Sequence, residues 1–304
     1  MAQNMLRSIV ILAVLSGLCM PATGCVSKEG IAQLDTGKLI SKKVHVSDID
    51  IAYKEAGAGY PLILIMGSGS TMDLWSPGLI SGLSQNNHII IFDNRGIGST
   101  SSSEREFSIR LFADDTAGLM DALNIKKANV LGWSMGTYVA QELALNYPET
   151  VNRLILCAAD VGGDKAIHSP DVIAQLSDSS GTEMERGERL LRLIFPEAWL
   201  KENPDPRKYM QMPTEQVLPE SIKNQGVACW KWAGTFSRLP QMKVPVLLIT
   251  GTDDIVTPPQ NSIMMADQIP AAWLVQIKNG GHGLMFQYPE KLVKTANLFL
   301  SMGE

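Results

Sequence analysis

Short, continuous apolar runs recur along the chain and constrain its fold more than any other feature. They read PLILIMG (61–67), HIIIFD (88–93), ANVLGW (128–133), RLILCAA (153–159), VPVLLITG (244–251) and WLVQIK (273–278). Strands that are apolar on both faces are typical of parallel sheets covered by helices on each side. Helical patterns lie between the runs, at 108–125, 135–147, 259–269 and 290–302. The alternation predicts an α/β fold with a mainly parallel, doubly wound sheet, preceded by an antiparallel hairpin at 44–53.

One long segment interrupts this rhythm. From 162 to 240 we recognise no strand pattern, and a polar helical stretch at 185–195 is followed by proline-rich sequence. Long insertions of this kind are usually functional. We therefore predict a helical cap at 162–240, inserted into a core formed by 26–161 and 241–304. The cap's aromatic side chains either contact a substrate or pack the cap itself: Trp230, Trp232 and Phe236.

The first 25 residues have the layout of an export signal. Arg7 precedes an apolar run at 9–18, and small residues lead to Cys25. The run is short for a membrane span. The close of this segment, ATGC (22–25), resembles a bacterial lipobox in which an alanine replaces the usual leucine. The sequence predicts an exported protein, lipid-anchored to the cell envelope through Cys25. Plain secretion or a periplasmic location, and an uncleaved anchor, are the alternatives.

Charge and cysteine content exclude several classes of function. A net charge of −5 gives no general basic field for nucleic acid. Outside the export segment only Cys157 and Cys229 remain. Cys157 ends the run LILC, which predicts a buried thiol, and a disulfide to Cys229 is the weaker alternative. We find no histidine and cysteine grouping with metal-ligand spacing, so no metal site is predicted.

The segment VLGWSMGTYVAQ (130–141) carries the first sign of chemistry. Gly132 to Gly136 fit the pattern G-x-S-x-G, between a predicted strand and a predicted helix. In that context the serine occupies a tight turn with its hydroxyl exposed, and the glycines allow close backbone approach. We predict Ser134 as a nucleophile, against the alternative of a turn without chemistry.

A serine hydroxyl needs a base that is itself held by a third group. His282 stands in NGGHG, a glycine-rich loop after the last strand, where it would reach over the carboxyl edge of the sheet. The acid is expected in TGTDDIVTPP, which leaves Asp253 and Asp254 as candidates. The other histidines lie in the hairpin, a buried strand and the insertion, and we expect them to be structural or solvated: His45, His88 and His168.

Together these motifs resemble the α/β-hydrolase fold family over residues 40 to 302. The chain order Ser, Asp, His is the order found in that family. Its Gly-x-x-Asp pattern, followed by Val and Pro, is matched by GTDDIVTP (251–258), and this resemblance implies Asp254 as the acid. Asp253 is a weaker candidate, and Asp160, after the strand LILCAA, is a third.

Two other segments are similar to the family. DNRGIGS (93–99) resembles its D-x-R-G-x-G loop, which implies architectural roles for Asp93 and Arg95. The stretch from 112 to 136 resembles the helix and strand that lead to its nucleophile. We expect Asp114 and Asp115 there to form a solvated helix face.

The loop after the third strand departs from the family pattern. Many relatives have His-Gly, whereas this chain has MGSGS at 66–70. Because the donors of an oxyanion hole are backbone N–H groups, loss of the histidine need not remove the function. By position, the resemblance implies the N–H groups of Ser68 and Met135, and a plain glycine-rich turn is the alternative. GSGSTM lacks the third glycine of G-x-G-x-x-G and no Walker lysine follows, so no nucleotide or other cofactor is predicted.

A serine nucleophile, a histidine base and a buried acid imply acyl transfer through an acyl-enzyme. A serine at the nucleophile position also argues against the dehalogenase and epoxide-hydrolase branches of the family that the chain resembles, which need an aspartate there. Apolar residues flank the predicted site and favour a small to medium apolar ester as the substrate: Met135, Leu284, Met285 and Phe286. The alternatives are a carbon–carbon bond hydrolase, a cofactor-free peroxidase of the same fold, and a non-catalytic ligand-binding protein that keeps the fold.

Overall fold

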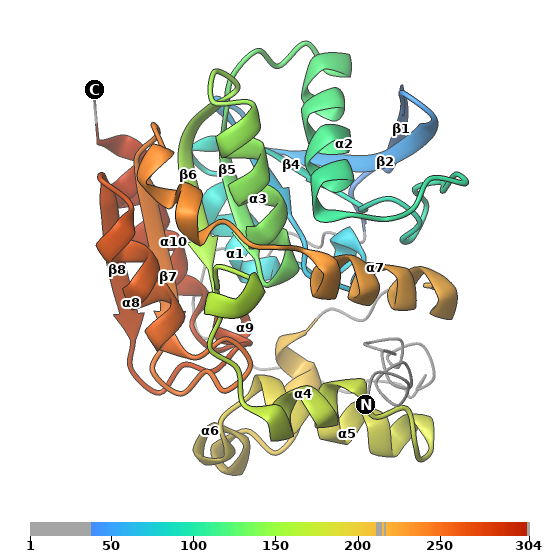
Figure 1. Cartoon of the computed structure of the whole chain (residues 1–304), viewed down its shortest axis with the longest axis vertical. Coiled ribbons are helices and arrows are strands. Elements are labelled where there is room, and N and C mark those ends of the chain that lie inside the picture. The colour runs from blue at the N-terminus through green and yellow to red at the C-terminus, as the bar shows by residue number, and fades with distance from the viewer. Residues whose placement is uncertain (1–37, 211–214, 216, 303–304) are drawn as a thin grey trace.

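An eight-stranded sheet forms the centre of the protein (Figure 1). The computed structural model describes residues 38–210, 215 and 217–302. The strands are Lys42–Val46 (β1), Ile49–Ala56 (β2), Tyr60–Ile65 (β3), Asn87–Phe92 (β4), Ala128–Trp133 (β5), Val151–Cys157 (β6), Val246–Gly251 (β7) and Ala272–Ile277 (β8). Their spatial order is β1-β2-β4-β3-β5-β6-β7-β8. The pairs β1–β2 and β2–β4 are antiparallel and the five other pairs are parallel, which confirms the predicted mainly parallel sheet.

Helices follow most of the strands. They are Pro77–Leu83 (α1), Ile109–Ala122 (α2), Met135–Asn146 (α3), Pro170–Ser177 (α4), Glu183–Ile194 (α5), Glu197–Glu202 (α6), Pro219–Lys231 (α7), Pro259–Gln268 (α8), Leu284–Gln287 (α9) and Pro289–Ser301 (α10). Short 3-10 helices lie at Met72–Leu74 (η2), Gly163–Lys165 (η3), Pro206–Tyr209 (η4) and Phe236–Gln241 (η5). Proline suits the first helical position because its fixed φ fits and its missing N–H is not needed there. At α2, Ser108 is the cap, and its Oγ accepts from the N–H of Leu111.

Helices cover both faces of the sheet. α2, α3 and α8 pack against one apolar face, while α1 and α10 pack against the other. Successive side chains of a strand point to opposite faces, so Val130 of β5 joins the first layer and Leu131 joins the second. The sheet is therefore doubly wound, as the continuous apolar runs predict.

The predicted hairpin at 44–53 is present as β1 and β2. Val46 pairs with Ile49, and Ser47 takes a φ of 56° in the turn between them. Ile49 and Ile51 are buried while Asp50 between them is exposed. This alternation holds at the start of β2 only, because all residues from 51 to 54 are buried and both faces of the strand are covered there.

The chain between β6 and β7 forms α4 to α7, and its described residues contain no strand. α4, α5 and α6 lie together at one end of the core (Figure 1). The N–H of Gly283, after β8, donates to the carbonyl of Ile194 at 2.8 Å, and the N–H of Thr235 donates to the carbonyl of Val161, after β6, at 2.8 Å. These contacts hold the insertion against loops at the carboxyl edge of the parallel strands.

The predicted export segment, residues 1–25 with Cys25, lies outside the described residues. Among the helices that the structure describes, none combines the length and the apolar character needed to cross a membrane.

Candidate active site

Ser134 occupies a strained turn between β5 and α3. Its φ is 54° and its ψ is −126°, a combination that residues with a side chain rarely adopt. The N–H of Ser134 donates to the carbonyl of Cys157 in β6 at 3.1 Å, and the N–H of Thr137 donates to the carbonyl of Ser134 at 2.8 Å. The turn is thus fixed from both sides, and the serine is partly accessible while its neighbours Trp133 and Met135 are buried.

Two glycines make this turn sterically feasible. A Cβ on Gly132 would lie 2.4 Å from the carbonyl oxygen of Gly136. A Cβ on Gly136 would lie 2.0 Å from the carbonyl oxygen of Ile65 at the end of β3. Both distances are far shorter than a van der Waals contact, so the G-x-S-x-G spacing has a steric cause here.

His282 meets the serine from the loop after β8. Its Nε2 lies 2.9 Å from the Oγ of Ser134. The indole N–H of Trp133 donates to the backbone carbonyl of His282 at 3.0 Å, and the two rings lie 5.3 Å apart. His282 is only 3% exposed. The residue that precedes the serine therefore also positions this histidine, a contact that the motif did not reveal.

Asp254 completes the chain of hydrogen bonds. Its Oδ2 lies 3.0 Å from Nδ1 of His282. Its Oδ1 accepts from the N–H groups of Val256 and Thr257, each at 2.9 Å, and the Thr257 hydroxyl donates to Oδ2 at 2.9 Å. The carboxylate is buried but fully engaged, as a buried charge must be. A carboxylate at this position favours the tautomer with the proton on Nδ1, which leaves Nε2 free to accept from the serine.

The two other acid candidates lie elsewhere. Asp253 is exposed and accepts from the hydroxyl of Thr252 at 2.8 Å. Asp160 is buried after β6, where it accepts from the Tyr138 hydroxyl at 2.6 Å and faces His168 at 3.8 Å. Burial raises the pKa of Asp160, and His168 opposes that rise. Of the three candidates, Asp254 is the one whose carboxylate is hydrogen-bonded to His282.

The loop after β3 packs directly on the serine turn. A Cβ on Gly67 would lie 2.9 Å from the ring of Trp133 and 3.1 Å from Cβ of Ser134. Ser68 follows in the chain, and Met135 follows Ser134 as the first residue of α3. The two residues expected to supply N–H groups thus flank the serine from two different elements.

The family described as alpha/beta hydrolase fold matches the chain over residues 60–199 and 170–289. The chain belongs to the α/β-hydrolase fold family. BpoC of Mycobacterium tuberculosis, provisionally named a non-heme bromoperoxidase, is 33% identical over 276 residues, which cover 82% of this chain and 97% of that protein. RutD of Azorhizobium caulinodans, provisionally named a carbamate hydrolase, is 28% identical over 250 residues, covering 81% and 93%.

The solved structure of an alpha/beta hydrolase fold protein from Chitinophaga pinensis is similar with a TM-score of 0.77 at 26% identity. It covers 89% of this chain and 100% of that chain. These relatives confirm the α/β-hydrolase fold. The reactions for which they are named differ, so these relatives do not identify a substrate.

Three aromatic side chains of the insertion have different surroundings in this α/β-hydrolase. Trp232 stacks on Tyr138 at 4.5 Å, and its indole N–H donates to Glu142 at 2.8 Å, so it packs the insertion on α3. Trp230 is 67% exposed. Phe195, which the sequence did not single out, lies 6.2 Å from Phe286, and a Cβ on Gly283 would meet its ring at 2.7 Å. Phe195 therefore packs against the loop that carries the histidine.

The predicted architectural loop after β4 holds a buried ion pair. The guanidinium of Arg95 donates to Asp115 at 2.8 and 2.6 Å and to Asp48 at 3.1 and 2.8 Å. The prediction that Asp115 lies on a solvated helix face is wrong, because it is 4% exposed and faces this arginine. Asp114 does lie on the outer side, paired with Arg110 at 2.7 Å. Although Asp114 and Asp115 are adjacent on α2, one side chain pairs with a surface arginine and the other with a buried arginine.

The remaining predicted residues lie outside the serine site. His45 contacts Asp50 and His88 contacts Glu55. Cys157 and Cys229 are free rather than joined. Burial raises the pKa of the Cys229 thiol to about 12 and raises that of Cys157 further. Both thiols therefore stay protonated and unreactive at neutral pH.

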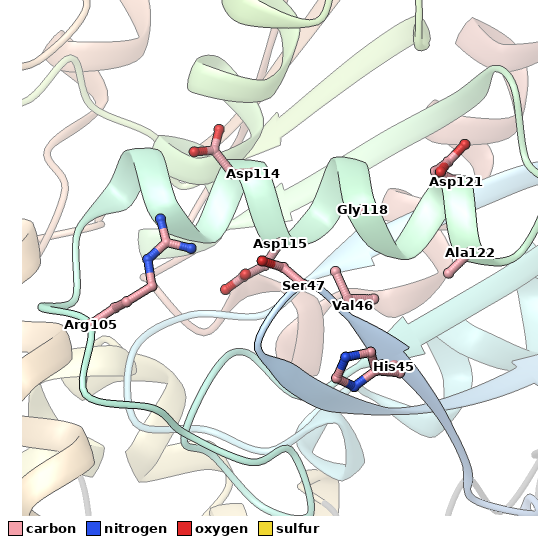
Figure 2. A pocket seen from close by; sticks show the side chains of 9 residues that line it. All are labelled: His45, Val46, Ser47, Arg105, Asp114, Asp115, Gly118, Asp121 and Ala122. Atoms are coloured by element: carbon pink, nitrogen blue, oxygen red, sulfur yellow. The ribbon is translucent and has the colours of Figure 1, made fainter.

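A surface cavity of about 260 Å³ lies between the β1–β2 turn and α2, as Figure 2 shows. His45, Val46 and Ser47 line one wall, and Asp115 and Gly118 line the other. Gly118 leaves the space that Val46 occupies, because a Cβ there would lie 2.4 Å from the valine. None of the lining residues belongs to the serine site, so this cavity is a separate feature of the α2 face.

Proposed function

We propose that this α/β-hydrolase cleaves carboxylic esters of small to medium apolar substrates. One observation carries the proposal: a continuous line of hydrogen bonds from Ser134 Oγ to His282 at 2.9 Å and on to Asp254 at 3.0 Å. A serine, an imidazole and a buried carboxylate in this order are the parts needed to activate a hydroxyl for attack on a carbonyl.

The proposed reaction has two halves. Ser134 Oγ attacks the ester carbonyl while its proton passes to Nε2 of His282, and the carbonyl oxygen becomes an oxyanion held by the N–H groups of Ser68 and Met135. The protonated imidazole, stabilised by Asp254, then gives the proton to the leaving alcohol and an acyl-enzyme remains. Water repeats the sequence, releases the acid and restores the serine.

The apolar preference rests on the residues around the serine. Met135 directly follows it, and Leu284 to Phe286 directly follow the histidine loop. All four are buried. An apolar acyl or alcohol group fits such surroundings better than a charged one, because burying an unpaired charge is costly.

A p-nitrophenyl ester series of increasing acyl length tests the proposal, with wild type, Ser134→Ala and the control Ser84→Ala. Ser84 is the C-cap of α1, and its hydroxyl donates to the carbonyl of Ser81 at 3.1 Å. We expect Ser134→Ala to lower kcat/KM by roughly a thousandfold or more and Ser84→Ala to leave it unchanged. A fluorophosphonate should label the peptide that contains Ser134. Equal turnover by wild type and Ser134→Ala would contradict the role of the serine.

The same experiment separates the alternatives. Turnover of vinylogous diketones without esters would favour a carbon–carbon bond hydrolase. Peroxide-dependent halogenation without ester cleavage would favour a peroxidase, the activity for which the relative BpoC is named. Ligand binding by wild type and Ser134→Ala, with no turnover by either, would favour a non-catalytic binding protein.

We also propose that residues 1–25 direct export and that Cys25 is lipidated. The support is the sequence pattern of a basic residue, an apolar run and ATGC. Cys25→Ser should abolish metabolic labelling with a fatty acid and release the protein from the membrane fraction. Unchanged labelling would contradict lipidation at this cysteine.

A further inference from the structure

A glutamine of the insertion reaches the loop beside the serine. Gln225 lies on α7 and is fully buried. Its Oε1 accepts from the N–H of Gly69 at 2.7 Å, across 156 positions of sequence, and the Ser68 hydroxyl lies 3.4 Å from the same oxygen. The insertion is thereby hydrogen-bonded to the backbone of the segment expected to supply an oxyanion donor.

Three other contacts hold the same loop. The Asn94 amide donates to the carbonyl of Met66 at 3.2 Å, and the N–H of Met72 donates to Asp93 at 2.7 Å. Between these two points the Gly67 backbone packs against Ser134. The peptide that joins Ser68 to Gly69 is therefore held at both ends by the core, while its own N–H is held by Gln225 alone among the contacts found in the described residues.

The orientation of the Gln225 amide follows from this contact. The Gly69 N–H requires an oxygen acceptor, so the amide oxygen must face the loop. This leaves Nε2 buried and without a hydrogen-bond partner in the described part of the chain. An unpaired buried donor destabilises the folded protein, because its hydrogen bond to water is lost and not replaced. A simple packing position would be served equally well by an apolar side chain, which has no such penalty.

The insertion also contacts the element that carries the second expected donor. Beyond the end of α7, Trp232 stacks on Tyr138, one turn after Ser134 in α3, and its indole donates to Glu142. The same stretch of insertion therefore touches both the loop of Ser68 and the helix of Met135. It fixes the spacing of the two elements between which an oxyanion would form.

We propose that Gln225 is a positioning residue of the oxyanion site. Its side-chain oxygen fixes the Ser68–Gly69 peptide, and through it the orientation of the Ser68 N–H towards the tetrahedral intermediate. The inference rests on the proposed function of the Ser134 site, although it applies to any acyl-type chemistry there. It assigns a role in catalysis to a residue of the insertion that never contacts the reacting atoms.

The test compares Gln225→Met with wild type and with Ser221→Ala. Methionine keeps the length of the side chain but offers no oxygen to Gly69. Ser221 is another buried polar residue of α7, and its hydroxyl would lie 3.1 Å from a Cβ placed on Gly96. We measure ester kcat and KM, affinity for an alkyl boronic acid that forms a tetrahedral adduct, and the rate at which a fluorophosphonate labels Ser134.

We expect Gln225→Met to lower kcat, boronate affinity and labelling rate by about 10- to 100-fold, with KM changed less than threefold. Loss of a whole oxyanion donor costs about 10²- to 10³-fold, and misplacement costs less. Ser221→Ala should match wild type. If Gln225→Met does not fold, as judged by circular dichroism, Gln225→Asn replaces it, because its amide is one methylene too short to reach Gly69.

Wild-type kcat and labelling rate in a folded Gln225 variant would overturn the proposal, and so would a rise in KM with kcat unchanged. Labelling of Ser134 does not require ester hydrolysis, so the labelling rate tests the role of Gln225 separately from the ester proposal. If wild type is labelled at Ser134 but hydrolyses no ester, the ester proposal fails while the labelling comparison still decides the role of Gln225.

Discussion

The hydroxyl of Ser134 and Nε2 of His282 lie 2.9 Å apart, although 148 positions of sequence separate the two residues. Ser134 follows β5 and His282 lies in the loop after β8, and the strands between them in the sheet are β6 and β7. Because all four strands are parallel, their following loops meet at one edge. Asp254 joins from the loop after β7. The topology of the sheet therefore explains how such distant residues meet.

The backbone of Ser134 leads to the first prediction. A φ of 54° with a ψ of −126° is unfavourable for a residue with a Cβ by about 1–3 kcal/mol. Ser134→Gly removes this strain and Ser134→Ala retains it, while both lose the hydroxyl. We expect the glycine variant to be more stable than the alanine variant by on the order of 1 kcal/mol, allowing for the greater entropy of unfolded glycine. Urea unfolding measures the difference, and equal stabilities would argue against strain.

Asp254 and its neighbour form a matched pair for the second prediction. Asp254→Asn replaces one carboxylate oxygen with an NH2 group, which favours the imidazole tautomer of His282 without a proton on Nδ1. We therefore expect kcat to fall by about 10³- to 10⁴-fold. Asp253→Asn changes an exposed side chain that accepts from the hydroxyl of Thr252, and kcat should stay within about twofold. Steady-state kinetics of both variants give the answer. A larger fall in kcat for Asp253→Asn than for Asp254→Asn would contradict the assignment of Asp254 as the acid.

Much of this arrangement could be predicted from local patterns. The apolar runs identify the parallel strands, since burial on both faces leaves a continuous signal. The edge strand β8 is the exception, because most of its residues are partly or fully exposed. G-x-S-x-G identifies Ser134 because its glycines have a steric cause in the chain itself. His282 and one of Asp253 and Asp254 could be expected at the same edge, because both loops follow strands predicted to be parallel. The choice of Asp254 came from the resemblance to the family pattern.

Other features have no local signal. Gln225 accepts a hydrogen bond from Gly69, and Trp133 donates one to the carbonyl of His282. No spacing in the sequence encodes these tertiary contacts. Asp114 and Asp115 are adjacent and chemically identical, yet only one faces Arg95. Which of two neighbouring carboxylates is buried depends on the rotation of α2 against β1, and that is set by packing rather than by sequence pattern.

Arg95 provides the third prediction. Its guanidinium is fully buried and bonded to two carboxylates, Asp115 and Asp48. Arg95→Met keeps the apolar stem but leaves a buried carboxylate without its partner, which typically destabilises by about 3–5 kcal/mol. Arg110→Met is the control, since Arg110 is half exposed and its pair with Asp114 should contribute about 0–1 kcal/mol. Chemical unfolding measures both, and similar small losses would contradict a structural role for the buried pair.

Asp93 lies beneath the loop that carries Ser68 and should make stability depend on pH. Its carboxyl is 1% exposed and accepts from the N–H groups of Met72 at 2.7 Å and Ser99 at 3.1 Å. Burial raises the pKa of Asp93 to about 7, and the two N–H groups only partly oppose that rise. In the unfolded chain an aspartate titrates near about 4.

The sign of the pH effect follows from these two values. Between about pH 4 and pH 7 the folded protein keeps a proton on Asp93 that the unfolded chain has released, so the free energy of unfolding falls as pH rises through this window. Asp93→Asn does not titrate. The stability of wild type relative to Asp93→Asn should therefore decline between pH 4 and pH 8, by up to about 4 kcal/mol. Urea unfolding at several pH values tests this, and a difference that grows with pH would show that the folded state favours the ionised carboxylate instead.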